Sequence, residues 1–111
     1  MKIPFNVNLS GKTAIVTGGS GTLCSAMAYG LAVSGAKVAL IGRNKEKMAK
    51  VVSELTDNAL KEHNATVTIN GYCCNVTDKE ELTKIYEAIK ADLGSCDILI
   101  NGAGGNQPGA I

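Results

Sequence analysis

Four short apolar segments, separated by three stretches of helical periodicity, constrain the fold of this chain more than any other feature. The segments are Lys12–Thr17, Lys37–Gly42, Thr66–Cys73 and Cys96–Asn101. Each is rich in aliphatic or β-branched residues and is flanked by turn-forming residues, which predicts buried β-strands. Strands joined through helices pair in parallel by right-handed crossovers. The pattern therefore predicts a βαβαβαβ chain of the α/β class.

The three intervening stretches carry apolar residues at three- and four-residue spacing, as amphipathic helices do. The first is predicted to run from Thr22 to Ser34 and to stop at Gly35. Asn44 is predicted to cap the second helix, and Thr77 with Glu80 to form a capping box for the third. The predicted apolar faces are Leu23, Ala26, Met27, Gly30, Leu31 and Ala32, then Met48, Val51, Val52, Leu55 and Ala59, then Leu82, Ile85, Tyr86, Ile89 and Leu93.

Composition narrows the class of protein. The chain has 111 residues, which suits one domain, and a net charge of +1 with scattered basic residues, which argues against a nucleic-acid partner. No apolar run approaches the length of a membrane-spanning helix. Four cysteines without a C-x-x-C pair, and one histidine, predict neither a metal site nor a disulfide framework. We expect packing thiols at Cys24, Cys73 and Cys96, a solvated His63 and a cytoplasmic location.

The crossovers predict the strand order 3-2-1-4, a partial doubly wound sheet of the Rossmann type. The order reverses between the first and fourth strands, and ligands of such sheets bind at the carboxyl ends beside that point. Glycine-rich stretches at Gly18 and Gly102 follow these two strands. Their convergence predicts a nucleotide site.

The stretch "VTGGSGTLCSAMA", Val16–Ala28, has the composition of a phosphate-binding loop. Its glycines permit a tight turn and close approach of the backbone, and Ser20 and Thr22 add hydroxyl donors. The helix that follows presents unpaired N–H groups and a positive dipole end to an anion. The alternative is a tight strand–helix turn without a ligand.

The end of the second strand, Gly42-Arg43-Asn44, carries no acid that would bind a ribose 2′-hydroxyl. The Arg43 guanidinium could instead meet a 2′-phosphate, which favours NADP over NAD. The alternative is that Arg43 is a surface residue at a helix start. Asn75, after the third strand, is either an adenine contact or a turn residue.

The segments "TGGSGTL", "GRN", "NVTD" and "DILINGAGG" resemble the N-terminal half of the short-chain dehydrogenase/reductase family, over essentially all 111 residues. In that family the motifs read TGxxxGxG, Asp-Val after the third strand, and NNAG after the fourth. The two glycine-rich loops are most similar to the classical branch and its D-mannonate oxidoreductase (fructuronate reductase) subgroup. The resemblance implies these cofactor contacts: Gly18, Ser20, Gly21, Thr22 and Leu23 at the pyrophosphate, Arg43 and Asn44 at the ribose, Asn75 and Val76 at the adenine, and Asn101, Gly102, Ala103 and Gly104 at the nicotinamide.

Three motifs depart from the family pattern. Thr22 and Cys24 stand at the later glycines of TGxxxGxG, Asn75 at the usual Asp, and Gly102 at the second Asn of NNAG. The loop also fits the TGxxGxxG form of the extended branch, again with Cys24 at the last glycine. A cysteine there is small enough for us to expect its cost in packing rather than in phosphate contact.

The family's catalytic Ser, Tyr-x-x-x-Lys pair and Asn follow the fourth strand, so no catalytic residue is predicted within this chain. Tyr86 and Lys90 match Y-x-x-x-K, but they lie in the helix before that strand and are predicted to pack. We expect residues 1–111 to be the N-terminal portion of a single dinucleotide-binding domain, inactive alone and with an uncovered fourth strand.

The resemblance implies a homo-oligomeric parent that transfers a hydride between NADP or NAD and a small carbonyl substrate. The alternatives are a non-catalytic NAD(P)-binding or sensing module and another Rossmann enzyme such as a methyltransferase. A methyltransferase usually requires an acid after the second strand, and this chain has none there.

Overall fold

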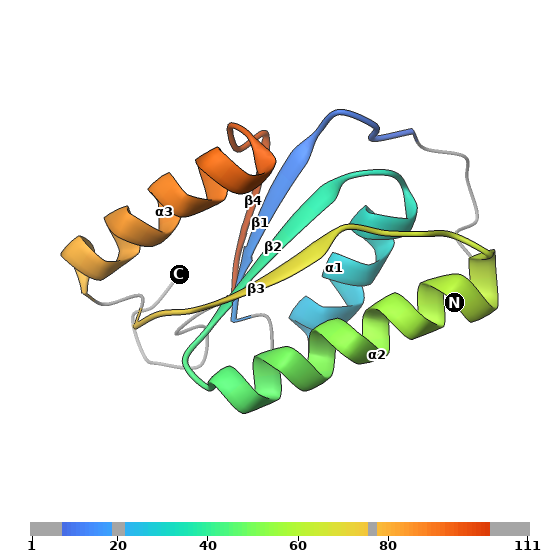
Figure 1. The fold of residues 1–111 in the computed structure, drawn as a ribbon, viewed down its shortest axis with the longest axis horizontal. Helices are drawn as coiled ribbons and strands as arrows, with labels where there is room; N and C mark the ends of the chain where they lie inside the picture. Colours follow the sequence, from blue (N-terminus) through green and yellow to red (C-terminus); the bar gives the residue numbers. More distant parts are fainter. Residues whose placement is uncertain (1–7, 19–21, 76–77, 103–111) are drawn as a thin grey trace.

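A computed structural model of the chain describes residues 8–18, 22–75 and 78–102. Strands and helices alternate along it (Figure 1). The strands form one parallel sheet in the order β3-β2-β1-β4, which confirms the predicted fold class and strand order. The elements are β1 (Thr13–Thr17), α1 (Thr22–Val33), β2 (Lys37–Gly42), α2 (Lys45–His63), β3 (Ile69–Cys73), α3 (Lys79–Leu93) and β4 (Ile98–Asn101).

The sheet separates two apolar layers. Helices α1 and α2 cover one face and α3 covers part of the other (Figure 1). Side chains alternate along β2, so Val38 and Leu40 face α1 and α2 whereas Ala39 and Ile41 face α3. Strands β1 and β2 are almost wholly buried because each has a strand on both sides and a helix layer near both faces.

Asp97 aligns β4 with β1. Its carboxylate accepts a hydrogen bond from the Thr13 N–H at 2.9 Å, and its own N–H donates to the Thr13 carbonyl at 2.8 Å. The Thr13 hydroxyl donates to the Leu93 carbonyl at 2.9 Å, at the end of α3. The pairing of Ala14 with Ile98 follows, and it brings the carboxyl ends of the two strands level.

The start of α3 differs from the prediction. The N-cap is Asp78, whose Oδ1 accepts from the N–H groups of Glu80 and Glu81 at 3.1 and 3.2 Å. The predicted capping box with Thr77 was wrong, and Thr77 itself lies outside the described residues. A carboxylate caps here because its negative charge also complements the helix dipole.

The buried face of α1 was only partly predicted. Cys24, Ala28 and Ala32, spaced four residues apart, are buried together with Tyr29, while Met27 is only partly buried. Four-residue spacing of small side chains lets the helix lie close to the sheet. The packing of α1 and α2 therefore buries smaller residues of α1 than the hydrophobicity pattern predicts.

Tyr29 joins α1 to α2. Its hydroxyl donates to Glu62 Oε1 at 2.5 Å, and its ring centroid lies 5.9 Å from that of His63. His63 is half-buried and thus less solvated than predicted. Tyr29 has an aromatic body that can be buried in the apolar layer and a hydroxyl that reaches the polar end of α2.

The cysteine predictions hold for Cys24 but not for Cys73 and Cys96, which are exposed. Cys74 is the second buried thiol, packed in the layer beneath α3. Its burial raises the pKa of this thiol, and nearby acidic groups raise it further. Within the described ranges all four cysteines are free and no group of His, Cys, Asp or Glu could hold a metal ion.

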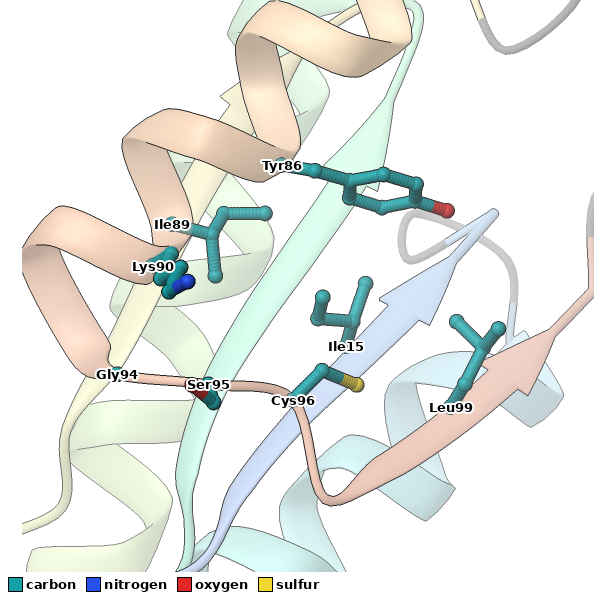
Figure 2. A pocket seen from close by; sticks show the side chains of 8 residues that line it. All are labelled: Ile15, Tyr86, Ile89, Lys90, Gly94, Ser95, Cys96 and Leu99. Atoms are coloured by element: carbon teal, nitrogen blue, oxygen red, sulfur yellow. The ribbon is translucent and has the colours of Figure 1, made fainter.

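On the α3 side of the sheet, β4 carries an open apolar groove of about 400 Å³. Figure 2 shows Tyr86 and Ile89 of α3 beside Ile15 of β1 and Leu99 of β4. Leu99 is 57% exposed because no helix in the described part of the chain covers this strand on that side. None of the helices α1 to α3 in the described residues is long and apolar enough to cross a membrane.

Candidate functional site

The carboxyl ends of β1 and β4 are joined by hydrogen bonds. The Gly102 N–H donates to both the carbonyl and the hydroxyl oxygen of Thr17, each at 3.2 Å. The Thr17 hydroxyl in turn donates to Asn101 Oδ1 at 2.9 Å. Thr17 is buried, and the sequence prediction assigned it no role. The two predicted glycine-rich stretches therefore begin at neighbouring points of one sheet edge.

Gly18 turns the chain away from β1. Its φ of 74° lies in the left-handed region, which favours glycine, and its N–H donates to the Ile41 carbonyl at 2.8 Å. Helix α1 begins at Thr22, so its N-terminus lies close after this turn, and its first turn contains no acidic residue. The positive end of the helix dipole is thus available to an anion from outside the helix.

The two departures at Cys24 and Gly102 fit each other. A Cβ atom on Gly102 would overlap the Cys24 sulfur and would lie 3.1 Å from the Thr17 carbonyl oxygen. The sulfur of the buried Cys24 therefore takes space that a side chain at residue 102 would need. Compared with the pattern given in the sequence analysis, Cys24 in α1 is larger than the expected glycine, and Gly102 after β4 is smaller than the expected asparagine.

Arg43 and Asn44 follow β2. Arg43 is exposed, and its carbonyl oxygen accepts a hydrogen bond from Cys73 Sγ at 3.2 Å. Asn44 caps α2 as predicted, with Oδ1 accepting from the Lys47 N–H at 3.0 Å. The first acid after β2 is Glu46, exposed in the first turn of α2. At the strand end itself the ionisable side chain is a guanidinium.

Asn75 lies after β3, beside the end of β2. The Cys74 N–H donates to the Gly42 carbonyl at 2.9 Å, so β3 stays paired with β2 up to this point. The Asn75 N–H donates to Glu81 Oε1 at 3.1 Å, which ties the strand end to α3. Asn75 is exposed on the same sheet edge as Arg43.

The structure thus brings a subset of the predicted contacts to one edge of the sheet. These are Gly18, Arg43, Asn44, Asn75, Asn101 and Gly102. Thr22 and Leu23 are the first two residues of α1, and the structure describes only their backbone. The remaining predicted contacts, Ser20, Gly21, Val76, Ala103 and Gly104, lie outside the described residues.

Tyr29 and Tyr72 are unsuited to donating or accepting a proton near neutral pH. Burial, together with the hydrogen bond to Glu62 and the charge of that carboxylate, raises the pKa of Tyr29 to about 12. Burial also raises the pKa of Tyr72, whose hydroxyl donates to Asp92 at 2.9 Å. In Figure 2 the Tyr86 ring extends over the apolar groove and away from Lys90. A tyrosine acid requires a cation that lowers its pKa instead.

Fold and site geometry together define an α/β protein in which two glycine-rich stretches begin at the switch point of the sheet. Residues 12–111 match the short chain dehydrogenase family, and the chain belongs to it. This confirms the resemblance noted in the sequence. The family is one of oxidoreductases with a nicotinamide-binding fold.

Relatives of the family support the same classification. The chain is 48% identical over 109 residues to the uncharacterized oxidoreductase UxuB of Bacillus subtilis, covering 98% of this chain and 37% of that protein. A solved structure of a candidate D-mannonate oxidoreductase from Haemophilus influenzae with bound NAD superimposes with a TM-score of 0.79 at 40% identity. The match covers 93% of this chain and 34% of that one.

L-Sorbose reductase from Gluconobacter frateurii, complexed with NADPH and L-sorbose, gives a TM-score of 0.77 at 26% identity. The match covers 96% of this chain and 38% of the reductase. The chain therefore spans little more than a third of the length of these relatives.

Proposed function

We propose that this chain is the dinucleotide-binding part of an oxidoreductase that transfers a hydride between NADP and a carbonyl or hydroxyl group. The observation that carries the proposal is the meeting of Gly18 and Gly102 through Thr17 at the switch point of the sheet. Of the related solved structures, the candidate D-mannonate oxidoreductase holds NAD and L-sorbose reductase holds NADPH.

Each predicted contact then has a distinct task. Gly18 lies at the pyrophosphate and provides the turn, since its own N–H is bonded to the Ile41 carbonyl. The backbone N–H groups that follow, up to Leu23, hold the pyrophosphate at the N-terminus of α1, helped by the hydroxyls of Ser20 and Thr22. Asn75 and Val76 contact the adenine, and residues 101–104 line the nicotinamide. The bound cofactor supplies the hydride chemistry, and the chain supplies orientation and exclusion of water.

NADP is our first choice of cofactor because the side chain available at the end of β2 is Arg43. A guanidinium can bind a 2′-phosphate with two parallel hydrogen bonds, whereas an NAD site normally offers an acid to the ribose. Asn44 contributes through its backbone and amide, since its side-chain oxygen already caps α2.

We further propose that the full-length protein acts on a sugar acid of the D-fructuronate/D-mannonate type. The support is the similarity to the candidate D-mannonate oxidoreductase and the UxuB protein. A catalytic Ser, Tyr and Lys would come from the length of the relatives that this chain does not span. Four free cysteines are consistent with a reducing, cytoplasmic compartment, and the relatives' family favours a homo-oligomer.

Calorimetric titration of the chain with NADP and NAD tests cofactor binding. We expect Arg43→Ala to weaken NADP binding about tenfold, the equivalent of ~1.4 kcal/mol, and to change NAD binding less than about twofold. Lys50→Ala is the matched control, because Lys50 is an exposed cation of α2 away from the strand end. Absence of binding by either dinucleotide would reject the proposal.

The second candidate function is a non-catalytic NAD(P)-binding module. The raised pKa values of Tyr29 and Tyr72 favour it for the 111-residue chain alone. A hydride-transfer assay with uronates and other small carbonyl compounds separates the two functions. Cofactor binding without turnover by the full-length protein would support the module and reject the enzyme.

A further inference from the structure

The space beside the last residue of β2 is filled by Met48 of α2. Gly42 is buried and lies on the same side of β2 as Val38 and Leu40. A Cβ atom on Gly42 would lie 2.5 Å from Met48 Sδ and 3.2 Å from Met48 Cγ. Comfortable carbon contacts are about 3.5–4.0 Å, so any side chain at residue 42 competes with Met48 for the same volume.

Met48 is held in this position from several directions. It is 3% exposed and belongs to the layer between α2 and the sheet. Its N–H donates to the Asn44 carbonyl at 3.0 Å, in the first turn after the cap. A Cβ atom on Gly71 of β3 would lie 3.6 Å from Met48 Cβ, so neighbouring strands provide glycines beneath this turn of α2. The thioether therefore fills the space beside Gly42.

Residue 42 is also the position from which an acid would reach the 2′-hydroxyl of an adenosine ribose. A carboxylate attached there would first meet the Met48 thioether, and its charge would be buried without a partner. We propose that Met48 is a specificity-determining residue that keeps a carboxylate out of the ribose subsite and leaves recognition to Arg43. The proposal rests on the dinucleotide site proposed above.

Selectivity then depends on two residues rather than one. Gly42→Asp alone is expected to destabilise the fold and to create no preference for NAD, because the new side chain has no room. Gly42→Asp with Met48→Ala provides that room. The ratio of the NAD to the NADP dissociation constant is expected to fall at least tenfold relative to both the unsubstituted chain and Gly42→Asp.

Calorimetry with NAD and NADP on the 111-residue chain tests this expectation. Gly42→Asp with Met48→Leu is the matched control, since leucine keeps most of the methionine volume and should preserve the block. The inference would be overturned if the double variants with Met48→Ala and with Met48→Leu shifted the preference toward NAD equally. The inference would also be overturned if Gly42→Asp alone gave the whole shift of preference toward NAD and left the thermal stability unchanged.

A second readout needs no cofactor. Thermal unfolding of Gly42→Ala, Met48→Ala and the double variant measures the steric competition directly. In the chain that keeps Met48, we expect Gly42→Ala to lower the midpoint temperature of unfolding. In the Met48→Ala background, the same substitution should leave that temperature unchanged or raise it. Additive shifts would overturn the inference. If the unsubstituted chain binds neither dinucleotide but the unfolding shifts are non-additive, the proposed function fails and the competition at residue 42 stands. If it binds NADP and the double variant shows no shift toward NAD, only the inference about Met48 fails.

Discussion

At the scale of single residues, the contact between Cys24 and Gly102 accounts for two departures from the family pattern at once. Neither residue is unusual alone, since each is small and apolar. The Cys24 sulfur lies where a Cβ atom at residue 102 would be, with the Thr17 carbonyl on the other side. The pair keeps α1 close to the end of β4 while the Gly102 N–H remains bonded to Thr17.

A double-mutant cycle measures this fit. Gly102→Ala is expected to destabilise the chain by about 1–3 kcal/mol, because a methyl group overpacks a filled site. Cys24→Ala removes the sulfur, so the double variant should recover at least about 1 kcal/mol relative to additivity. Urea unfolding monitored by circular dichroism gives the free energies. Additive effects would show that the two residues do not compete for space.

Cys24→Leu extends the same series. A leucine should weaken folding and cofactor binding together, whereas Cys24→Gly should be tolerated. Tight cofactor binding by the leucine variant would contradict the packing role assigned to Cys24.

At the scale of elements, the sequence predicted the sheet well because four buried segments and short connections leave one plausible parallel arrangement. The predicted third strand was too long at its start, because β3 begins at Ile69 rather than at Thr66. Helix faces were harder to predict, since burial of Tyr29 depends on how α1 and α2 pack. The contacts of Cys24 with Gly102 and of Met48 with Gly42 join separate elements, so no local spacing reveals them.

The burial of Tyr29, together with its hydrogen bond to Glu62 between α1 and α2, predicts a pH dependence of stability. The pKa of Tyr29 is raised from 10.0 to about 12 in the folded chain. Between these values the unfolded chain loses the phenolic proton first, so stability falls as pH rises from about 10 to about 12. Below pH 10 the stabilising contribution is fully present.

Tyr29→Phe provides the test. Urea unfolding at a series of alkaline pH values should give a shallower decline for the phenylalanine variant than for the unsubstituted chain. Tyr86→Phe is the matched control, because Tyr86 is 36% exposed and lies on another helix. Parallel declines for Tyr29→Phe and the unsubstituted chain would contradict the assignment of the effect to Tyr29.

At the scale of the whole molecule, one sheet face is less complete than the other. Helices α1 and α2 cover their face, whereas the groove beside α3 leaves Leu99 of β4 57% exposed (Figure 2). Among the described strands β4 pairs only with β1, so its outer edge also offers unpaired backbone groups. An apolar groove beside an open edge promotes association between copies of a chain.

We therefore expect the 111-residue chain to self-associate through the β4 side of the sheet, and Leu99→Gln to shift it toward monomer. Sedimentation velocity over a range of concentrations measures the change. Leu60→Gln is the matched control, because Leu60 is also 57% exposed but lies on α2, outside the groove. Both substitutions replace exposed side chains, so each should change the free energy of unfolding by no more than about 0.5 kcal/mol. Equal effects of the two substitutions on association would attribute it to general surface hydrophobicity and reject a role for the groove.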